Sequence, residues 1–212
     1  KIDIDEFLTF EMMSSQLAEG KSDASIMAIE NSIAGSIIPN YALIDEYNLS
    51  IVGECYLKIS HNLLALENQS IDDIKEVHSH PMALLQCRDF FKKYPKIKLV
   101  EGTDTALSAK EIYTNNVKGR AAIASTLASD LYSLDILAKN IQTIKNNETR
   151  FVILERSTLN SKSKFNKASI KFELDHKRGS LATILNVMSD CKMNLTKIQS
   201  IPKIETPWRY SF

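Results

Sequence analysis

The sequence predicts an α/β domain followed by a smaller β-α-β-β segment, and three observations support this division. Short apolar runs alternate with helical patterns between residues 77 and 131, in the order β-α-β-α-β-α, which is typical of a parallel sheet with crossover helices. A polar stretch without periodicity follows at residues 157–167. A second strand pattern then begins at Ala168. We therefore expect domains at residues 1–156 and 168–212, joined by a linker at 157–167.

Three candidate strands lie in the N-terminal part of the chain. The apolar run Ser25–Ile29 ends at the polar residues 30–32, as expected for a buried strand followed by a loop. Residues 51–59 alternate between apolar and polar side chains, and residues 62–66 form a third, mostly apolar run. A further short strand is expected to end at Val77.

A helix is expected from Pro81, because proline is favoured in the first turn of a helix. Pro95 is expected to stop it. Apolar residues three or four apart form one stripe along this helix: Leu84, Cys87, Phe91 and Tyr94. The stripe predicts that one side of the helix packs in the core.

The remaining elements of the first domain complete the alternation. A strand is expected at residues 97–100, followed by a helix at residues 104–113 with Thr103 as its N-cap. Another strand is expected at residues 121–124, and Ser125 is expected to start a helix that runs through residue 131.

The second domain begins with an alternating segment, residues 168–174, which predicts a half-buried strand. Gly179 and Ser180 open a helix whose apolar residues have i, i+3, i+4, i+7 spacing: Leu181, Ile184, Leu185 and Met188. A second strand is expected at residues 195–198, and the chain ends within a third. This segment is small for an independent core, so we expect it to be incomplete here or completed by another chain.

Charge, hydropathy and cysteine content exclude several classes of protein. Lys+Arg and Asp+Glu both number 26, so the net charge is zero, which argues against nonspecific nucleic-acid binding. Neither a membrane-spanning run nor a signal peptide is recognisable. The three cysteines are widely spaced, which disfavours a disulfide scaffold or a zinc site and fits a reducing compartment. We therefore expect a cytoplasmic protein with no membrane or nucleic-acid partner.

The sequence also lacks the motifs of common cofactor sites. Neither GxGxxG nor the complete P-loop motif GxxxxGK[ST] occurs, since Ser15 stands where the glycine five positions before Gly20-Lys21-Ser22 would be. A metal site at His78 and His80 is disfavoured, and Cys87 is interpreted as a core residue because it lies on the apolar stripe. We expect neither a cofactor nor a metal.

Polar clusters near the ends of predicted strands are the remaining candidates for a site. They are Glu30-Asn31-Ser32, His78-Ser79-His80-Pro81, and Thr149-Arg150-Phe151 before the apolar strand 152–154. Ligands of α/β sheets bind at strand ends, and the free N–H groups of a helix N-terminus suit a carboxylate. For any one of these clusters taken alone, turn formation and helix capping are the favoured explanation.

Taken in order, the clusters resemble one family. The matching pieces are Ala28-Ile29-Glu30-Asn31-Ser32 with Gly35-Ser36, Ile59-Ser60-His61-Asn62-Leu63, His78-Ser79-His80-Pro81 with Gln86-Cys87, Asp104-Thr105-Ala106, Ala121–Ser125, Asn147 with Thr149-Arg150-Phe151, Gly179-Ser180-Leu181, and Asn194–Ile198. This order and spacing resemble prephenate dehydratase with a C-terminal ACT regulatory domain. The resemblance extends over essentially the whole chain.

The resemblance implies a fold and a reaction. The fold would be a two-lobed α/β catalytic domain, like a type II periplasmic binding protein, followed by an α+β ferredoxin-like ACT domain. The activity would be that of a cofactor-free hydro-lyase that converts prephenate to phenylpyruvate, water and carbon dioxide on the route to phenylalanine. Phenylalanine would be the feedback effector, and the protein would form a homodimer or homotetramer.

The resemblance also implies roles for individual residues. Thr149 would be the catalytic residue that donates to the departing hydroxyl oxygen, and Arg150 would bind a substrate carboxylate. Other substrate-binding residues would be Glu30, Asn31, Ser32, Ser79, Gln86 and Phe151. In the regulatory domain, phenylalanine would bind at Gly179, Ser180, Leu181 and Ala182, with Asn194 contributed by a partner chain.

Two departures from the family pattern and two alternative functions accompany this reading. The first strand and Gly-rich loop of the family do not precede Lys1, and Gln199-Ser200-Ile201-Pro202 replaces the frequent Glu-Ser-Arg-Pro motif. One alternative is a two-lobed protein that binds or senses a small molecule without catalysis. The other is the dehydratase part of a bifunctional chorismate mutase–prephenate dehydratase.

Overall fold

The structure is a computed structural model that describes residues 3–156, 166–202, 206 and 210–212. The chain divides into two compact units, Lys1–Arg156 and Ser157–Phe212. Most of the expected linker lies outside the described residues. Within the described residues, no helix is long and apolar enough to cross a membrane.

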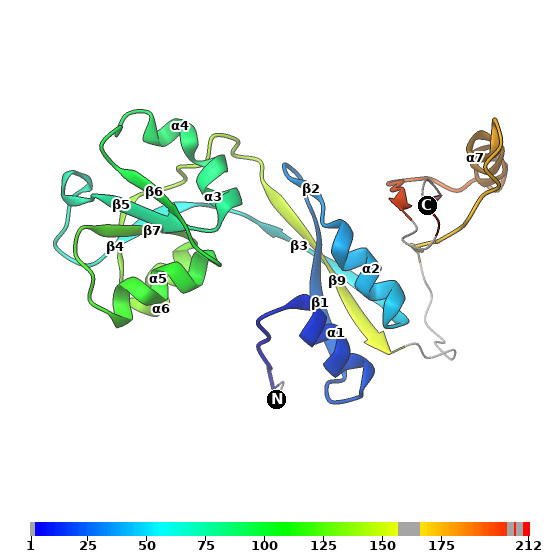
Figure 1. Ribbon diagram of the computed structural model, residues 1–212, viewed down its shortest axis with the longest axis horizontal. Coiled ribbons are helices and arrows are strands. Elements are labelled where there is room, and N and C mark those ends of the chain that lie inside the picture. Colours follow the sequence, from blue (N-terminus) through cyan, green and yellow to red (C-terminus); the bar gives the residue numbers. More distant parts are fainter. Residues whose placement is uncertain (1–2, 157–165, 203–205, 207–209) are drawn as a thin grey trace. The chain divides into compact units, whose positions relative to one another are not determined.

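The first lobe of the N-terminal unit contains a four-stranded sheet (Figure 1). Its strand order is β2-β1-β9-β3, and each pair of neighbours is antiparallel. The strands are β1 (Ala24–Asn31), β2 (Gly35–Ser36), β3 (Leu49–Lys58) and β9 (Glu148–Arg156). Strand β9 therefore lies between β1 and β3, although it follows them by a long stretch of sequence.

Two helices that the sequence pattern did not indicate, α1 (Phe10–Ala18) and α2 (Ile38–Glu46), supply side chains to the core of this lobe. Leu17 of α1 is fully buried and belongs to one cluster with alternate residues of the strands: Met27, Ile29, Val152 and Leu154. Tyr41 and Ile44 of α2 pack against the same cluster. Burial of this alternate set fixes which side of β1 and β9 faces the helices.

The second lobe contains a five-stranded mixed sheet in the order β6-β5-β7-β4-β8. Strand β5 (Glu76–Ser79) is parallel to β6 (Lys98–Glu101) and to β7 (Arg120–Ala124), as the alternation of strands and helices predicts. Strands β4 (Asn62–Ala65) and β8 (Asp135–Ala138) add antiparallel pairs at one side.

Helices supply a hydrophobic core on each face of this sheet. One core joins α3 (Pro81–Gln86) and α4 (Arg88–Phe91) to Leu63 and Ile123, and the other joins α5 (Thr105–Thr114) and α6 (Thr126–Tyr132) to Leu64 and Ala122. Successive strand residues thus face opposite layers. A single-turn helix, Ile71–Asp73, precedes β5.

The structure corrects two expected helices of the first domain. The helix expected to run from Pro81 to Pro95 is wrong, because it breaks at Cys87 into α3 and α4. Cys87 has φ −101° and ψ 3°, and the carbonyl of the preceding residue accepts a hydrogen bond from the backbone N–H of Thr143 instead (2.9 Å). Thr103 is not the N-cap of α5, since the Asp104 carboxylate accepts the first N–H groups of that helix at 2.8 and 2.9 Å.

The second unit contains α7 (Ser180–Asp190), which starts after Gly179 as expected, and a short antiparallel pair, β10 (Ile201–Pro202) and β11 (Tyr210–Ser211). The strands expected at 168–174 and 195–198 do not form among the described residues. The first of these segments pairs with the chain end only at Phe172, which exchanges two backbone hydrogen bonds of 3.0 Å with Phe212, and at an adjacent bridge. Too few partner residues are paired with it for a continuous ladder.

Candidate functional site

The polar residues at the end of β1 meet the start of β9. Asn31 is the register partner of Thr149, and Glu30 is the partner of Arg150. Thr149 and Arg150 are therefore part of strand β9 rather than of a loop before it, which corrects their expected position. Both residues are half-buried. The structure thus brings two of the sequence clusters together in one sheet.

The side-chain amide of Asn31 has a defined orientation. Its oxygen accepts the backbone N–H groups of Ile33 (3.0 Å) and Ala34 (2.9 Å). Because these two groups can only donate, the amide nitrogen of Asn31 must face the other way. That nitrogen lies 2.7 Å from the side-chain oxygen of Asn147, 3.1 Å from the hydroxyl oxygen of Thr149 and 3.2 Å from the carbonyl oxygen of Glu148, so its two N–H groups are divided among three acceptors. The Thr149 hydroxyl therefore accepts from Asn31, which leaves its own proton available for donation.

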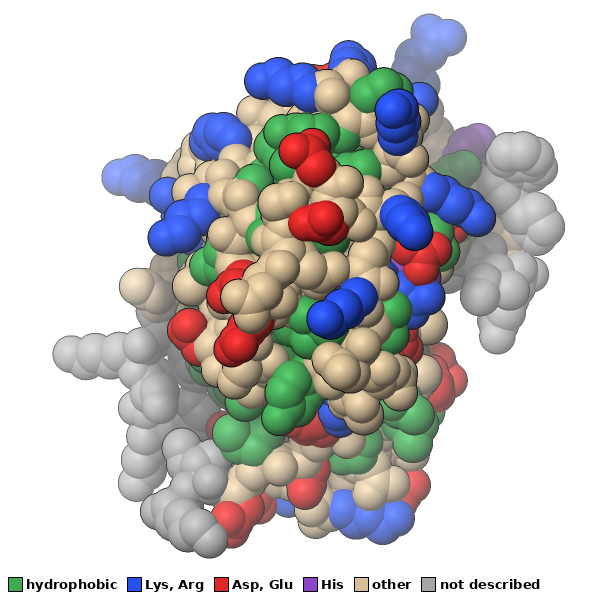
Figure 2. All heavy atoms as spheres, turned by 90° about the vertical axis from the view of Figure 1, so that its left-hand side faces the viewer, with side chains coloured by type: hydrophobic (Ala, Val, Ile, Leu, Met, Phe, Trp, Pro, Cys, Tyr) green, Lys and Arg blue, Asp and Glu red, His purple; other side chains and the backbone are tan. Residues whose placement is uncertain are grey.

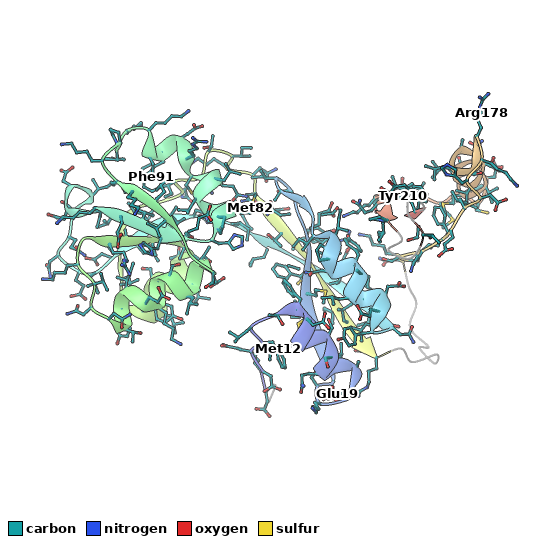
Figure 3. The ribbon with its side chains drawn as sticks, viewed as in Figure 1. Met12, Glu19, Met82, Phe91, Arg178 and Tyr210 are labelled. Carbon is teal, nitrogen blue, oxygen red and sulfur yellow. The ribbon has the colours of Figure 1, made fainter. Side chains whose placement is uncertain are left out.

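The same argument extends to the second lobe through Asn147, which is fully buried. Its oxygen accepts from Asn31, so its nitrogen donates to Oε1 of Gln86 at 2.9 Å. Nε2 of His61 lies 2.9 Å from that same oxygen. With two donors on Oε1, the NH2 group of Gln86 remains available to donate. Gln86 is the last residue of α3, the helix marked by Met82 in Figure 3.

His61 is a buried, neutral member of this network. Its residue exposure is 6%, and burial lowers the pKa of the imidazole, while the hydrogen bond to Gln86 acts in the opposite direction. The Gln86 oxygen requires a donor, which assigns the proton of the neutral ring to Nε2. His61 thus supplies a fixed N–H group without adding a positive charge.

The two serines among the expected substrate-binding residues have different positions. Ser32 is exposed and connects its loop to β9, because its hydroxyl accepts the N–H of Glu148 at 2.9 Å. Ser79 is fully buried, and its hydroxyl donates to the carbonyl of Ile123 at 2.7 Å. The proton of the Ser79 hydroxyl is therefore donated within the second lobe, and contact of Ser79 with a substrate stays a prediction.

Arg150 is held by two carboxylates. Its Nε and Nη2 lie 2.8 and 2.7 Å from one oxygen of Glu54, and its Nη1 lies 3.7 Å from Glu30. Burial lowers the pKa of Arg150, but the hydrogen bond and charge of Glu54 outweigh this effect and raise it overall. The guanidinium is thus a permanent positive charge in the sheet. Phe151, the next residue of β9, is half-buried and lies between Ala28 and Cys55 in register.

Sequence reasoning did not assign roles to two residues of the cluster, Asn147 and His61. Asn147 precedes the selected residue Thr149 by two positions. His61 immediately precedes the buried strand β4. A polar residue inside or beside an apolar strand is the available signal, because such a residue must find hydrogen-bond partners when buried. Among the described residues, no three His, Cys, Asp or Glu side chains lie close enough to hold a metal ion.

The expected effector residues lie around the start of α7. Gly179 has a left-handed conformation with φ +83°, and Ser180 and Leu181 line a pocket in this unit. Other residues that line it are Asp175, His176, Tyr210 and Phe212. Ala182 and Asn194 are exposed and are not part of its lining.

The arrangement in the first unit can bind a polar, anionic molecule and donate to it. Thr149 and Gln86 each offer a directed hydrogen-bond donor, and Arg150 offers positive charge. All three hold their positions through contacts within the protein, which is the preorganisation that favours stabilisation of developing charge.

Comparison with known proteins relates this arrangement to one family. The family model described as prephenate dehydratase matches residues 1–159. The bifunctional chorismate mutase/prephenate dehydratase of Buchnera aphidicola subsp. Acyrthosiphon pisum is 34% identical over 208 residues, 98% of this chain and 54% of that protein. The chloroplastic arogenate dehydratase/prephenate dehydratase 2 of Arabidopsis thaliana is 40% identical over 190 residues, 89% of this chain and 50% of that protein. The chain thus spans about half the length of these relatives.

Two solved structures are similar over nearly the whole chain. The prephenate dehydratase from Arthrobacter aurescens in complex with L-Phe has a TM-score of 0.77 and 26% identity, and the match covers 93% of this chain and 66% of that one. GqqA, described as a novel type of quorum quenching acylase, has a TM-score of 0.79 and 27% identity, with 96% and 74% covered. Both matches extend over the two lobes and into the second unit.

Proposed function

The chain belongs to the prephenate dehydratase family, and we propose that it converts prephenate to phenylpyruvate in phenylalanine biosynthesis. Prephenate is a dianion, and the reaction consumes one proton. The ring carboxylate leaves as carbon dioxide, its bonding electrons form the aromatic ring, and the ring hydroxyl leaves as water after it receives the proton. The protein must therefore bind two negative charges and direct a donor at the departing oxygen.

The polarity of the Thr149 hydroxyl is the observation that supports this proposal best. Asn31 donates to its oxygen at 3.1 Å, so the hydroxyl proton is not used in this contact and can be donated to a further acceptor. The leaving oxygen of prephenate would be that acceptor. A threonine is a weak acid, so Thr149 would act as a hydrogen-bond donor that stabilises the departing oxygen, and the proton consumed in the reaction would come from solvent.

Substrate recognition would rest on Gln86 and Arg150. The free NH2 group of Gln86 can donate to a carboxylate or to the ketone oxygen. Arg150 already binds Glu54 through two nitrogens, and its Nη1 has the longer contact, 3.7 Å to Glu30. We propose that Nη1 faces the substrate carboxylate, with Glu30, Asn31, Ser32 and Phe151 forming the adjoining wall.

The test is an assay of phenylpyruvate formed from prephenate by the full chain, with arogenate and chorismate supplied in parallel reactions. The proposal predicts turnover of prephenate. Turnover of arogenate alone would replace the substrate, as the name of the plant relative suggests. Turnover of chorismate would indicate the bifunctional alternative. Binding of prephenate without turnover of any of them would support the non-catalytic binding protein instead.

The similarity to GqqA makes acyl transfer a second function to test. Such chemistry ordinarily requires a nucleophile activated by a base. The histidine in the cluster, His61, contacts the amide of Gln86 rather than a serine or cysteine, which favours the dehydratase. Hydrolysis of an N-acyl amide test substrate at a rate that exceeds turnover of prephenate would reverse this preference.

We further propose that the second unit is part of a ferredoxin-like ACT domain that binds phenylalanine as an effector. The pocket beside Ser180 and Leu181 supports this assignment, as does the L-Phe complex described for the structure from Arthrobacter aurescens. The effector would contact Gly179, Ser180, Leu181 and Ala182, and Asn194 would come from the partner in a homodimer or homotetramer. The three cysteines, all free, are consistent with a cytoplasmic location.

A further inference from the structure

His61 lies where the chain crosses between the two lobes. The first crossing joins β3 to β4, and the second, residues 139–147, joins β8 to β9. Backbone N–H of His61 donates to the Gln142 side chain at 3.0 Å, and its carbonyl accepts from Ile141 at 2.8 Å. Ile59 likewise donates to the carbonyl of Asn147 at 2.8 Å. The two crossings are therefore hydrogen-bonded to each other. Both the backbone N–H and the carbonyl of His61 take part in these bonds.

The imidazole uses this fixed position to hold Gln86. Oε1 of Gln86 accepts hydrogen bonds from Nε2 of His61 and from Nδ2 of Asn147, both at 2.9 Å. These donors come from the first and second crossings, respectively. A single donor would leave the amide free to rotate about that hydrogen bond, whereas two donors define the plane of the amide. The NH2 group of Gln86 is then aimed in one direction.

We propose that His61 is a positioning residue of the dehydratase reaction, which acts through Gln86 by keeping its NH2 group directed at the substrate. The inference rests on the proposed function of this cluster. It assigns to His61 neither proton transfer nor contact with substrate. A neutral Nε2–H donor is what the position requires, and burial of the ring maintains that neutral form.

Two substitutions of nearly equal polarity separate this role from a structural one. The amide of glutamine places its nitrogen near the position of Nε2, whereas the amide of asparagine is one methylene shorter and reaches only to the position of Nδ1. His61→Asn is therefore expected to lower kcat/KM for prephenate roughly three- to tenfold, the worth of one hydrogen bond. His61→Gln is expected to restore most of it. Equal activity of the two variants would overturn the proposal.

A double-mutant cycle with Gln86 identifies the route of the effect. If His61 acts through Gln86, adding His61→Asn to Gln86→Leu costs nothing further, and the two losses are not additive. Additive losses would mean that His61 acts elsewhere, which also overturns the proposal.

Ser129→Ala is the matched control, because Ser129 is as buried as His61 and its hydroxyl donates to the carbonyl of Leu134 within the second lobe, away from both crossings. It should lower the melting temperature without the loss of kcat/KM.

Failure of the proposed function is recognised separately, since the unsubstituted chain would then show no turnover of prephenate. If His61→Asn does not fold, His61→Leu, which also removes the donor, takes its place in the cycle with Gln86→Leu, and additivity there has the same meaning.

Discussion

The side-chain nitrogen of Asn31 donates a hydrogen bond to the hydroxyl oxygen of Thr149 across 3.1 Å, although 118 residues separate them in sequence. The bond exists because β1 and β9 are neighbours in the sheet and these two residues are register partners. It decides the chemistry available to the threonine, since an oxygen that accepts from Asn31 leaves the hydroxyl proton for another acceptor. Four predictions follow from this and related contacts.

Thr149→Val should remove most turnover of prephenate while the protein stays folded. Valine has nearly the shape of threonine and high strand propensity, but it cannot donate to the departing oxygen. Loss of a positioned donor of this kind typically lowers the rate by about 10²- to 10⁴-fold. The measurement is kcat together with the melting temperature. Thr114→Val, on an exposed position of α5, is the control, and near-normal kcat for Thr149→Val would rule out the assigned role.

Arg150→Lys should raise KM for prephenate, because lysine keeps the charge but loses the planar fork. Glu54→Gln provides the complementary test. It removes the charge that holds Nε and Nη2 of Arg150, so a substrate carboxylate would compete more easily and KM should fall. KM for prephenate is measured for each of the two variants, and the unfolding temperature of each serves as the control for the fold. If neither substitution changes KM, Arg150 serves only as the partner of carboxylates within the protein.

His61 should make the protein less stable as the pH falls. Burial lowers its folded-state pKa below the ordinary value near 6.5, so the unfolded chain binds the proton more readily. The free energy of unfolding should therefore decrease as the pH drops from about 7 through about 6.5 toward the folded pKa. Urea denaturation at several pH values checks this, with His61→Gln as the comparison. Parallel pH curves for the two proteins would contradict the expectation.

Gly179→Val should abolish inhibition by phenylalanine. The residue has φ +83°, a conformation that strains a β-branched side chain. A Cβ placed there meets no heavy atom within 4 Å among the described residues, so the side chain would occupy space proposed for the ligand. Gly179→Asn is the informative comparison, because asparagine tolerates the conformation. Calorimetric titration with phenylalanine checks both variants, and turnover without phenylalanine reports that the catalytic unit is folded.

Unchanged inhibition of Gly179→Val would place the effector elsewhere. Retained inhibition in Gly179→Asn together with its loss in Gly179→Val would show that backbone conformation, rather than free space at the Cβ position, is what the effector requires.

The order of elements in the second lobe was predictable because period and capping are local properties. The alternation of strands and helices between residues 77 and 131 predicts the parallel arrangement of β5, β6 and β7 that the structure has. The break at Cys87 was not predictable, since its cause is a hydrogen bond from Thr143, far away in sequence, to the carbonyl of Gln86. The choice between Thr103 and Asp104 as a cap was also open, because both residue types cap helices.

The candidate site shows the same division between local and distant information. Sequence reasoning selected Asn31, Gln86 and Thr149, but the contacts that orient them depend on Asn147 and His61, whose importance arises only when two crossings meet. Ser79 also has a partner that the sequence does not indicate. Its hydroxyl donates to the carbonyl of Ile123 in the core, and its contact with a substrate stays a prediction. Whether a hydroxyl faces ligand or core depends on the sheet register, which the local pattern does not contain.

The position of β9 between β1 and β3 has a consequence for how the protein is made. The ribosome releases the chain from its N-terminus, so β1 and β3 emerge before the strand that joins them, and about 90 residues follow Lys58 before Glu148 appears. At about 5–20 residues per second, the first lobe waits roughly 5–20 s for its central strand. The second lobe lies wholly within that interval and can fold first. During this delay the apolar side chains of β1 and α1 have no completed sheet to cover them, so the core of the first lobe closes only after the second lobe has been synthesised.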